Sequence, residues 1–317
     1  MKVLVRILSI ALIYLFITAP QGFASTANPP LKSFDALVVG EQILDISSRL
    51  GYAPKAFVGR YSLWDQGPKM ELVSHRLGCP VKVCKKSPKT VPTALAKKNI
   101  SHVIIQKSKT YCLYKKVAPP CVQKKLGDRS DLTIDTIDFT RGLDSAVLQV
   151  ATLLGCPEKA APLMETYEKQ MAVAQKNLGR VAPGKRVVIL SGTFQRDTGK
   201  TFLRVEAPGG YSDKYMLAPL KAENVGLGLK VGNGKISKGH FTIRKLAPLA
   251  KINPDIIVLM GDTGAVQKAL NKAVAKHPEL ARVKALANQA VYALPFYAHC
   301  DPLAYPAKLN KWACMFR

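Results

Sequence analysis

Aromatic, basic and polar side chains follow several of the strands that the sequence predicts. In an open α/β sheet, ligands bind beyond the carboxyl ends of the strands, on the loops that come next. The candidate ligand-binding residues on these loops are Arg60, Tyr61, Trp64, Lys107, Tyr111, Gln195, Arg196, Asp262, Thr263, Phe296, Tyr297 and His299. Aromatic rings stack on a flat ligand, and Arg and Lys pair with its carboxylates. The set predicts a site for an anionic, conjugated molecule, and Tyr297 or His299 could also ligate an iron centre.

Seven cysteines favour an oxidising compartment. The expected disulfides are three local pairs, Cys79 with Cys84, Cys112 with Cys121, and Cys300 with Cys314. Cys156 is then left as a buried thiol, although spacing does not fix the connectivity. The alternative is that some cysteines bind a metal ion together with His75 or His299, but the spacings match no standard zinc pattern.

Basic residues far outnumber acidic ones. The chain has 47 Lys and Arg against 21 Asp and Glu, a formal net charge of +26. This charge favours an anionic partner, which is nucleic acid, an anionic membrane surface or an acidic small ligand. Residues 80–125 contain twelve lysines and no acidic residue. That segment is either a solvated surface or a positive rim that concentrates an anionic ligand.

The first 24 residues have the pattern of a secretory signal peptide. Lys2 and Arg6 precede an apolar run at residues 7–18, and the small residues Gly22 and Ala24 follow it. The run is short for a membrane span, and we expect cleavage after Ala24. Export without another long apolar run implies a soluble protein outside the cytoplasm, where nucleic acid is an improbable partner.

Residues 156–178 predict one long amphipathic helix, because apolar residues recur there at steps of three and four. At about 1.5 Å per residue such a helix is roughly 35 Å long, more than the width of a small lobe. We expect an N-terminal α/β lobe at residues 25–154, a linking helix at 155–180 and a C-terminal α/β lobe at 181–317. The alternative is a helix packed on a single sheet.

Strand and helix patterns alternate on both sides of this helix, which is typical of parallel sheets. The expected strands are residues 34–39, 56–59, 101–106, 135–139, 186–190, 255–260 and 290–294. The expected helices are residues 42–50, 94–98, 143–154, 212–220, 242–249, 265–275 and 302–316.

The sequence resembles the helix-linked periplasmic binding proteins of ABC importers, the receptors for siderophores, haem, vitamin B12 and metal ions. The resemblance rests on residues 34–60, residues 143–171, INPDIIVLMG (252–261) and LARVKALANQAVYALP (280–295), in this order along the chain. It implies two Rossmann-like lobes, each with a small, mainly parallel sheet, joined by a single long helix. It also implies a monomer without a resident cofactor, a small hinge motion on ligand binding, and delivery to an inner-membrane ABC permease.

Two departures from the family are visible. Members usually carry an acidic residue on each lobe to meet arginines of the permease, and Glu223 is the candidate in the second lobe. Residues 90–98 of the first lobe have no acidic residue. The lysine-rich insertions that contain cysteines are also outside the general pattern.

Motifs for catalysis are absent. Residues 194–201 (FQRDTGKT) end like a phosphate-binding loop, but Phe194 stands where the loop needs glycine. The five histidines include no pair four residues apart.

The sequence therefore predicts no enzyme. It predicts a periplasmic substrate-binding protein that captures an anionic metal chelate, such as a siderophore, haem or another tetrapyrrole or corrinoid, in a cleft between the lobes. The alternatives are a bare metal-ion receptor with Cys and His ligands and, in a different class, a secreted thiol redox protein or enzyme. The absence of a CxxC motif weakens the redox alternative.

Overall fold

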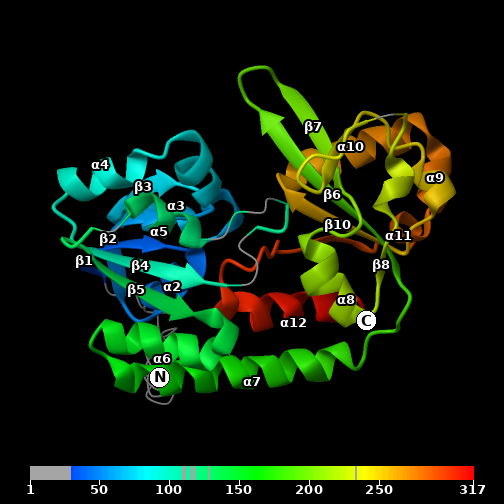
Figure 1. Cartoon of the computed structure of the whole chain (residues 1–317). Coiled ribbons are helices and arrows are strands. Elements are labelled where there is room, and N and C mark those ends of the chain that lie inside the picture. The colour runs from blue at the N-terminus through cyan, green and yellow to red at the C-terminus, as the bar shows by residue number, and fades with distance from the viewer. Residues whose placement is uncertain (1–29, 109–111, 115–116, 118, 128, 233) are drawn as a thin grey trace, which may run out of the picture. The chain divides into compact units, whose positions relative to one another are not determined.

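The first sheet has five parallel strands in the order β3-β2-β1-β4-β5 (Figure 1). The strands are β1 (Lys32–Val39), β2 (Tyr52–Val58), β3 (His75–Gly78), β4 (His102–Lys107) and β5 (Thr133–Asp138). Apolar runs such as 36–39 and 103–105 are buried on both faces of the sheet, as expected for a central parallel strand. One face packs against α2 (Glu41–Arg49) and α6 (Leu143–Leu153), and the other against α4 (Thr90–Lys97) and α5 (Gln123–Leu126). The short helix α3 (Gly67–Val73) precedes β3.

The computed structural model describes residues 30–108, 112–114, 117, 119–127, 129–232 and 234–317. The predicted signal peptide and Tyr111 lie outside these residues. Residues 31–317 form one compact unit. Among the described residues, every helix is too short or too polar to cross a lipid bilayer.

The second sheet has six strands and is mixed. The order is β11-β10-β6-β7-β9, and β8 pairs with β6. The strands are β6 (Arg186–Gln195), β7 (Lys200–Glu206), β8 (Glu223–Asn224), β9 (His240–Ile243), β10 (Ile256–Gly261) and β11 (Val291–Ala293). Strands β6, β8, β10 and β11 are parallel, whereas β7 and β9 run antiparallel to their neighbours.

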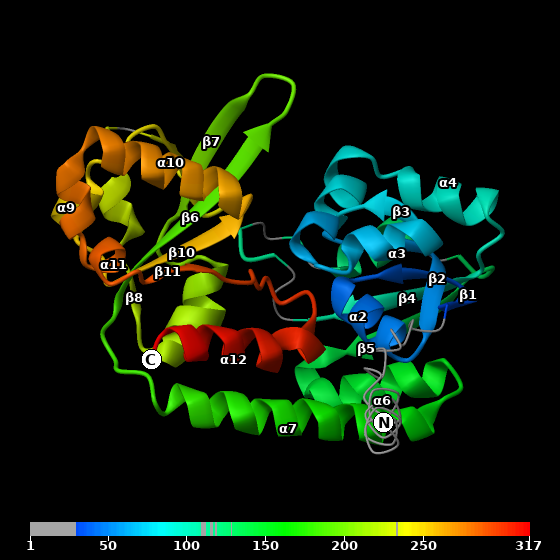
Figure 2. The ribbon, with the colours of Figure 1, turned by 180° about the vertical axis from the view of Figure 1, so that it is seen from behind.

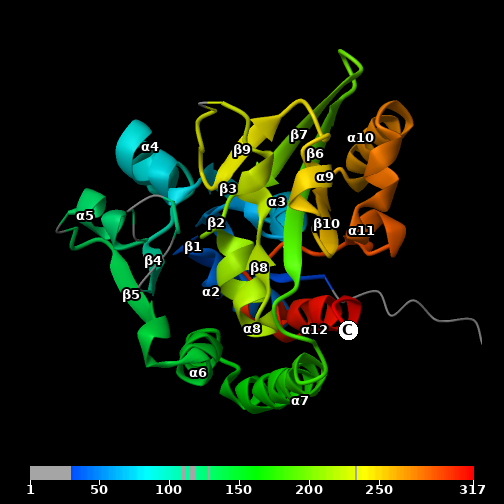
Figure 3. The same cartoon turned by 90° about the vertical axis from the view of Figure 1, so that its right-hand side faces the viewer.

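Helices cover both faces of this second sheet (Figure 3). The helices of one face are α9 (Leu249–Ile252), α10 (Thr263–Lys276) and α11 (Lys284–Ala287). The other face carries the π-helical turn η6 (Asp213–Leu217), α8 (Ala218–Leu220) and α12 (Tyr305–Met315). The two-lobed α/β fold predicted from the sequence is therefore confirmed.

The long helix α7 (Ala160–Leu178) lies between the two sheets in the chain, as predicted. Its first turns contribute Ala160 and Met164 to the core of the first sheet, whereas Ala174 near its end belongs to the core of the second. Helix α12 runs alongside α7 (Figure 2), and Asn177 Nδ2 donates to Asn310 Oδ1 over 2.6 Å. The single-sheet alternative is wrong, while the exact lobe boundaries stay a prediction.

One predicted helix is wrong, and four strands, β3, β7, β8 and β9, were not predicted. Residues 242–249 were expected to be helical, but β9 occupies their start and helix α9 begins only at Leu249. Phe241 and Ile243 are buried while Thr242 between them is exposed, which is the two-residue period of a strand. Residues 194–201, which end like a phosphate loop, form the tip of the β6–β7 hairpin.

The local disulfide pairs are wrong. Cys84 bonds to Cys121, and the thiols of Cys79, Cys112, Cys300 and Cys314 are free. Cys84 and Cys121 come from segments 37 residues apart, but both pack against the core on the α4 side of the first sheet. Proximity in the folded core, rather than proximity along the chain, decides this pairing. The thiol of Cys156 is buried, as predicted.

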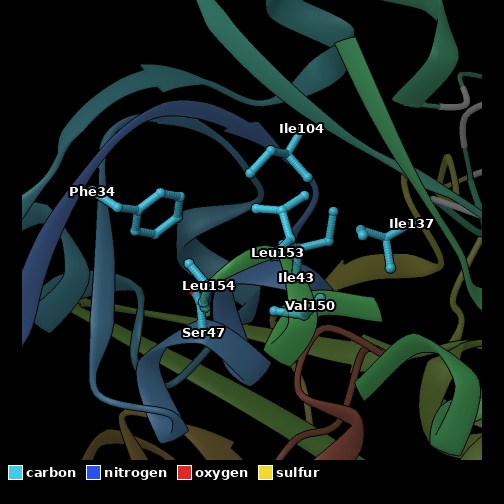
Figure 4. Close-up of a pocket in the computed structure, with 8 residues that line it drawn as sticks. All are labelled: Phe34, Ile43, Ser47, Ile104, Ile137, Val150, Leu153 and Leu154. Carbon is cyan, nitrogen blue, oxygen red and sulfur yellow. The ribbon is translucent and has the colours of Figure 1, made fainter. Parts of the chain in front are cut away.

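A small apolar cavity of about 10 Å³ lies inside the first lobe between the sheet, α2 and α6 (Figure 4). Its lining residues are Phe34, Ile43, Ser47, Ile104, Ile137, Val150, Leu153 and Leu154. The Ser47 hydroxyl already donates to Leu44 O over 3.2 Å. Since the volume is at the lower limit for one water molecule and the lining is apolar, the cavity is a packing defect and not a ligand site.

Gly40 at the start of α2 should resist substitution. Its φ is +128°, and a Cβ there would overlap the Gln106 side chain, which hydrogen-bonds to Gln42 at the first turn of α2. We expect Gly40→Ala to lower the free energy of unfolding by about 2–5 kcal/mol, through backbone strain and overpacking. Gly51→Ala is the matched control, because Gly51 has φ +94° but open space around it, so strain alone should cost about 1–2 kcal/mol. Equal losses in urea denaturation would contradict the role given to Gln106.

Candidate functional site

Arg60 is buried where loops of the two sheets meet. It follows β2 and is 9% exposed. Its Nε lies 3.0 Å from Glu41 Oε1, in an ion pair with a fully buried carboxylate of the first lobe. Its Nη1 donates to the Tyr211 hydroxyl over 2.7 Å, and its Nη2 donates to Ala298 O over 3.4 Å. One guanidinium therefore links a first-lobe carboxylate to two groups of the second lobe.

Aromatic rings of the second lobe pack together next to this guanidinium, whose Cζ lies 5.9 Å from the Tyr211 ring centroid. Their members come from the segment before and within η6 and from the segment after β11: Tyr211, Tyr215, Phe296, Tyr297, His299 and Tyr305. The ring of Tyr211 meets Phe296 edge-to-face at 6.0 Å, and Tyr215 meets Tyr297 edge-to-face at 5.3 Å. We call this group the aromatic cluster.

His299 lies parallel to Tyr215, with ring centroids 5.2 Å apart and an interplanar angle of 2°. Burial, together with the positive charges of Arg60 and Lys214, lowers the pKa of His299 to about 4. The imidazole is therefore neutral at neutral pH and keeps a lone pair on one ring nitrogen. Such a nitrogen is a suitable metal ligand.

Tyr297 is a weaker candidate as a ligand. It is 2% exposed, and burial together with Asp301 raises the pKa of its phenol well above the ordinary value. Its hydroxyl oxygen lies 3.4 Å from His299 Nδ1. A phenol that does not ionise supports the imidazole rather than supplying a phenolate.

The segment after β4 reaches the same place from the first lobe. Leu113 N donates to the Tyr211 hydroxyl over 2.8 Å, and the Tyr114 ring meets Tyr211 edge-to-face at 5.2 Å. Burial raises the pKa of Tyr211 to about 12 although Arg60 opposes this shift. The neutral Tyr211 hydroxyl thus accepts hydrogen bonds from Arg60 and from Leu113, which are 53 positions apart in the first half of the chain.

A second connection runs through Lys308 on α12. Its Nζ lies 2.8 Å from Asp301 Oδ2 and 2.7 Å from Asp65 Oδ2, and donates to Phe296 O over 3.1 Å. Asp65 belongs to the first lobe, two residues after the turn that contains Tyr61. The ammonium group therefore holds the segment of the aromatic cluster against the first lobe.

Four of the predicted residues come together in this site, namely Arg60, Phe296, Tyr297 and His299. Two others lie near Arg60 in the chain but face elsewhere. Tyr61 packs under the Arg76 guanidinium, with 4.4 Å to the ring centroid. Trp64 is 2% exposed in the core of the first lobe, and none of the described residues forms a hydrogen bond with its Nε1.

The remaining predicted residues have other contacts. Lys107 pairs with Asp138 over 2.7 Å. Gln195 and Arg196 are exposed at the β6–β7 hairpin. Asp262 caps α10 by accepting from Ala265 N, and Thr263 is the first residue of that helix. No hydrogen bond or ring contact of the described residues joins these five residues to Arg60 or the aromatic cluster.

Tyr211, Tyr215 and Tyr114 were not predicted as site residues. Tyr211 and Tyr215 are four residues apart at the start of a predicted helix, directly after Gly209 and Gly210. That spacing places two rings on one helical face and was the available signal. Among the described residues no group of three His, Cys, Asp or Glu side chains could hold a metal ion.

Tyr211→Phe should lower the free energy of unfolding, because the Tyr211 hydroxyl connects first-lobe and second-lobe residues of the site. The substitution removes the oxygen that accepts from Arg60 Nη1 and Leu113 N. Leaving buried donors without an acceptor costs about 1–3 kcal/mol in the free energy of unfolding. The control is Tyr292→Phe, since no hydrogen bond of the described residues uses the Tyr292 hydroxyl. Equal stability of both variants in urea denaturation would show that the Tyr211 hydroxyl contributes nothing.

Glu206 at the end of β7 is fully buried beside this site. Its carboxylate accepts hydrogen bonds from Ser212 N over 3.0 Å and from Ser212 Oγ over 2.7 Å. Burial nevertheless raises the pKa of Glu206 to about 7 from an ordinary value of 4.5. The folded protein therefore holds a proton in a pH range in which the unfolded chain has lost it.

Stability should fall as pH rises through this range. The unfolded chain binds fewer protons than the folded protein between about pH 4.5 and 7, so the free energy of unfolding should drop by about 2–3 kcal/mol. Glu206→Gln should remove most of that drop, measured by urea denaturation between about pH 4.5 and 8. Glu168→Gln, on an exposed position of α7, is the control. A Glu206→Gln variant with the wild-type pH slope would exclude Glu206 as its source.

Comparison with known proteins agrees with this architecture. A sequence profile of periplasmic binding proteins matches residues 122–298. The fold is similar to the periplasmic heme-binding protein RhuT from Roseiflexus sp. RS-1 (17% identity, 90% of this chain and 98% of that chain covered, TM-score 0.54). It is also similar to the heme-binding protein BhuT in complex with two hemes (15%, 90% and 100%, 0.54) and to the iron-uptake system-binding protein FeuA from Bacillus subtilis (12%, 87% and 94%, 0.53).

At these identities the similarity to solved structures shows a shared fold, and a sequence search of curated proteins gives no match. The profile match carries more weight because it spans more than half of the 317 residues. The protein belongs to the periplasmic binding protein family.

Proposed function

We propose that the protein is the substrate-binding component of an ABC importer and captures an anionic metal chelate, such as a siderophore, haem or another tetrapyrrole. The observation that carries this proposal is the neutral imidazole of His299, which stacks on Tyr215 in the aromatic cluster and is under the electrostatic influence of the Arg60 guanidinium. The ligand would then pass to an inner-membrane permease. The predicted signal peptide agrees with a periplasmic location.

The half-buried rings of the aromatic cluster suit a flat, conjugated ligand. Tyr215, Phe296 and His299 each keep part of their surface exposed, and flat ligands stack on such rings. Exposed Lys214 lies with its Nζ 5.3 Å from the Tyr215 ring centroid. It offers a mobile ammonium group for a carboxylate of the ligand, while the net charge of +26 attracts anions at longer range.

His299 is the proposed metal ligand in preference to Tyr297. A neutral imidazole needs no deprotonation at neutral pH, whereas the pKa of the Tyr297 phenol is raised well above its ordinary value by burial. If His299 Nδ1 donates its proton to the Tyr297 oxygen, the lone pair lies on Nε2. Tyr297 then orients the imidazole of His299 without contacting the metal.

Trp64 has a supporting role in this proposal. Its ring fills the core of the first lobe four residues after Arg60 and fixes the loop that carries the guanidinium. For the permease, Glu223 on β8 is the proposed docking residue of the second lobe, because its side chain is exposed. The first lobe offers no acidic residue between positions 80 and 125.

Replacing His299 tests the proposal. The variants His299→Ala and Tyr297→Phe should be titrated with haem and with a ferric catecholate siderophore, and binding followed by visible absorption. We expect His299→Ala to weaken binding at least about tenfold and to shift the absorption bands, since the loss of one metal bond exceeds about 1.4 kcal/mol. Tyr297→Phe keeps the packing and should change affinity less than about threefold.

His277→Ala is the matched control. His277 lies directly after α10, and its only ion pair among the described residues is with Glu279. If His299→Ala and His277→Ala bind either chelate equally well, His299 is not a ligand. If the wild-type protein binds neither haem nor the ferric siderophore, the proposed ligand class is wrong.

A further inference from the structure

A hollow of about 410 Å³ opens on the first lobe between the edge strand β3 and helix α4, away from the residues of the candidate site. Its lining residues are His75, Leu77, Lys89, Thr90, Thr93, Ala94, Lys97 and Lys98. Figure 1 shows α4 beside β3 at the outer end of this lobe. We call it the α4 hollow.

The helix presents one face to the α4 hollow. Thr90, Thr93, Ala94 and Lys97 follow a spacing of three, four and seven residues, which places them on one face. Val91 and Leu95 on the other side are buried in the core and fix the helix to the sheet. The polar face is therefore held in place by the fold.

Three lysines bring positive charge to this hollow. Lys89 and Lys98 flank α4 at its two ends, and Lys97 lies in its last turn. Among the described residues none of the three lysines takes part in an ion pair, and residues 80–125 contain no acidic residue. Like charges that share a hollow repel each other, so an anion bound there would remove a repulsion that the protein itself leaves uncompensated.

The lining chemistry suits a multiply charged anion. Three ammonium groups act as point charges of the kind that bind phosphate, and two phosphate groups together carry about three to four negative charges. Thr90 and Thr93 add hydroxyl donors in the first turn of α4, where the helix dipole also favours an anion. The volume lies within the range of small-molecule sites and exceeds the needs of a single phosphate ion.

We propose that the α4 hollow is a second binding site, for a ligand that carries two phosphate groups. It shares no lining residue with the site around Arg60 and His299. The ligand is either a free bisphosphate anion or the bisphosphorylated headgroup of a lipid, and both present the same chemistry to the three lysines.

Titration calorimetry of the full chain with inorganic pyrophosphate at low ionic strength tests this site. The hollow variant is Lys89→Gln/Lys97→Gln/Lys98→Gln. The control variant, Lys86→Gln/Lys124→Gln/Lys125→Gln, removes the same charge from exposed lysines of the same segment that do not line the hollow. We expect the hollow variant to lose at least about tenfold in affinity and the control less than about threefold. Exposed Lys→Gln changes have little effect on folding, and a thermal melt checks this for each variant.

Vesicles distinguish the two sources of the phosphates. Phosphatidylcholine vesicles with and without lipid A, whose disaccharide carries two phosphates, are sedimented with each protein. A free anion is supported if only the hollow variant loses pyrophosphate binding and no protein sediments with lipid A vesicles. A lipid headgroup is supported if wild-type protein sediments with lipid A vesicles and only the hollow variant loses this sedimentation. Equal weakening of both variants would overturn the proposal in favour of diffuse surface charge. Absence of binding to both probes, or citrate binding as tight as pyrophosphate, would overturn it as well.

Discussion

The buried guanidinium of Arg60 constrains the whole interface between the lobes. A charge that is removed from water must be paired and its donors satisfied, or the fold loses several kcal/mol. Glu41 supplies the opposite charge from the first lobe, while the Tyr211 hydroxyl and Ala298 O of the second lobe accept hydrogen bonds from the guanidinium. Any large separation of the lobes would leave the guanidinium with unsatisfied donors. The group that suits an anionic ligand is thus also the group that holds the lobes in register.

One covalent connection and one ion pair limit motion further. Helix α7 shares its apolar residues between the two cores, and the segment from Phe296 to α12 returns to the first lobe, where Lys308 pairs with Asp65. Hinge motion needs a few residues that absorb changes in φ and ψ, and a continuous helix beside a second anchored segment offers little room for them. A ligand would therefore enter through small displacements of side chains such as Lys214 and His299 rather than through a wide opening.

The sequence predicted the parts of the fold that depend on local pattern and missed those that depend on distant partners. Continuous apolar runs gave the central strands, and three- and four-residue spacing gave α7. The bond between Cys84 and Cys121 depends on a shared core that no spacing reveals. At the site, Arg60, Phe296, Tyr297 and His299 follow strands and could be predicted. Trp64 could not be placed, because whether a ring after a strand points toward the other lobe or into the core is decided by packing.

Burial shifts the pKa values of the neighbouring side chains His299 and Tyr297 in opposite directions, and both shifts affect which of them can bind a metal. Burial disfavours charge, so it lowers the pKa of His299 to about 4 and raises the pKa of Tyr297 well above its usual range. The first shift leaves a free lone pair at neutral pH, and the second removes the phenolate. The cations Arg60 and Lys214 that keep the imidazole neutral would also attract an anionic chelate. A metal ion competes with protons for the imidazole, so a site that repels protons leaves the imidazole open to a metal. The same positive charges repel a bare cation and attract an anion. The site therefore favours a metal that arrives inside an anionic ligand.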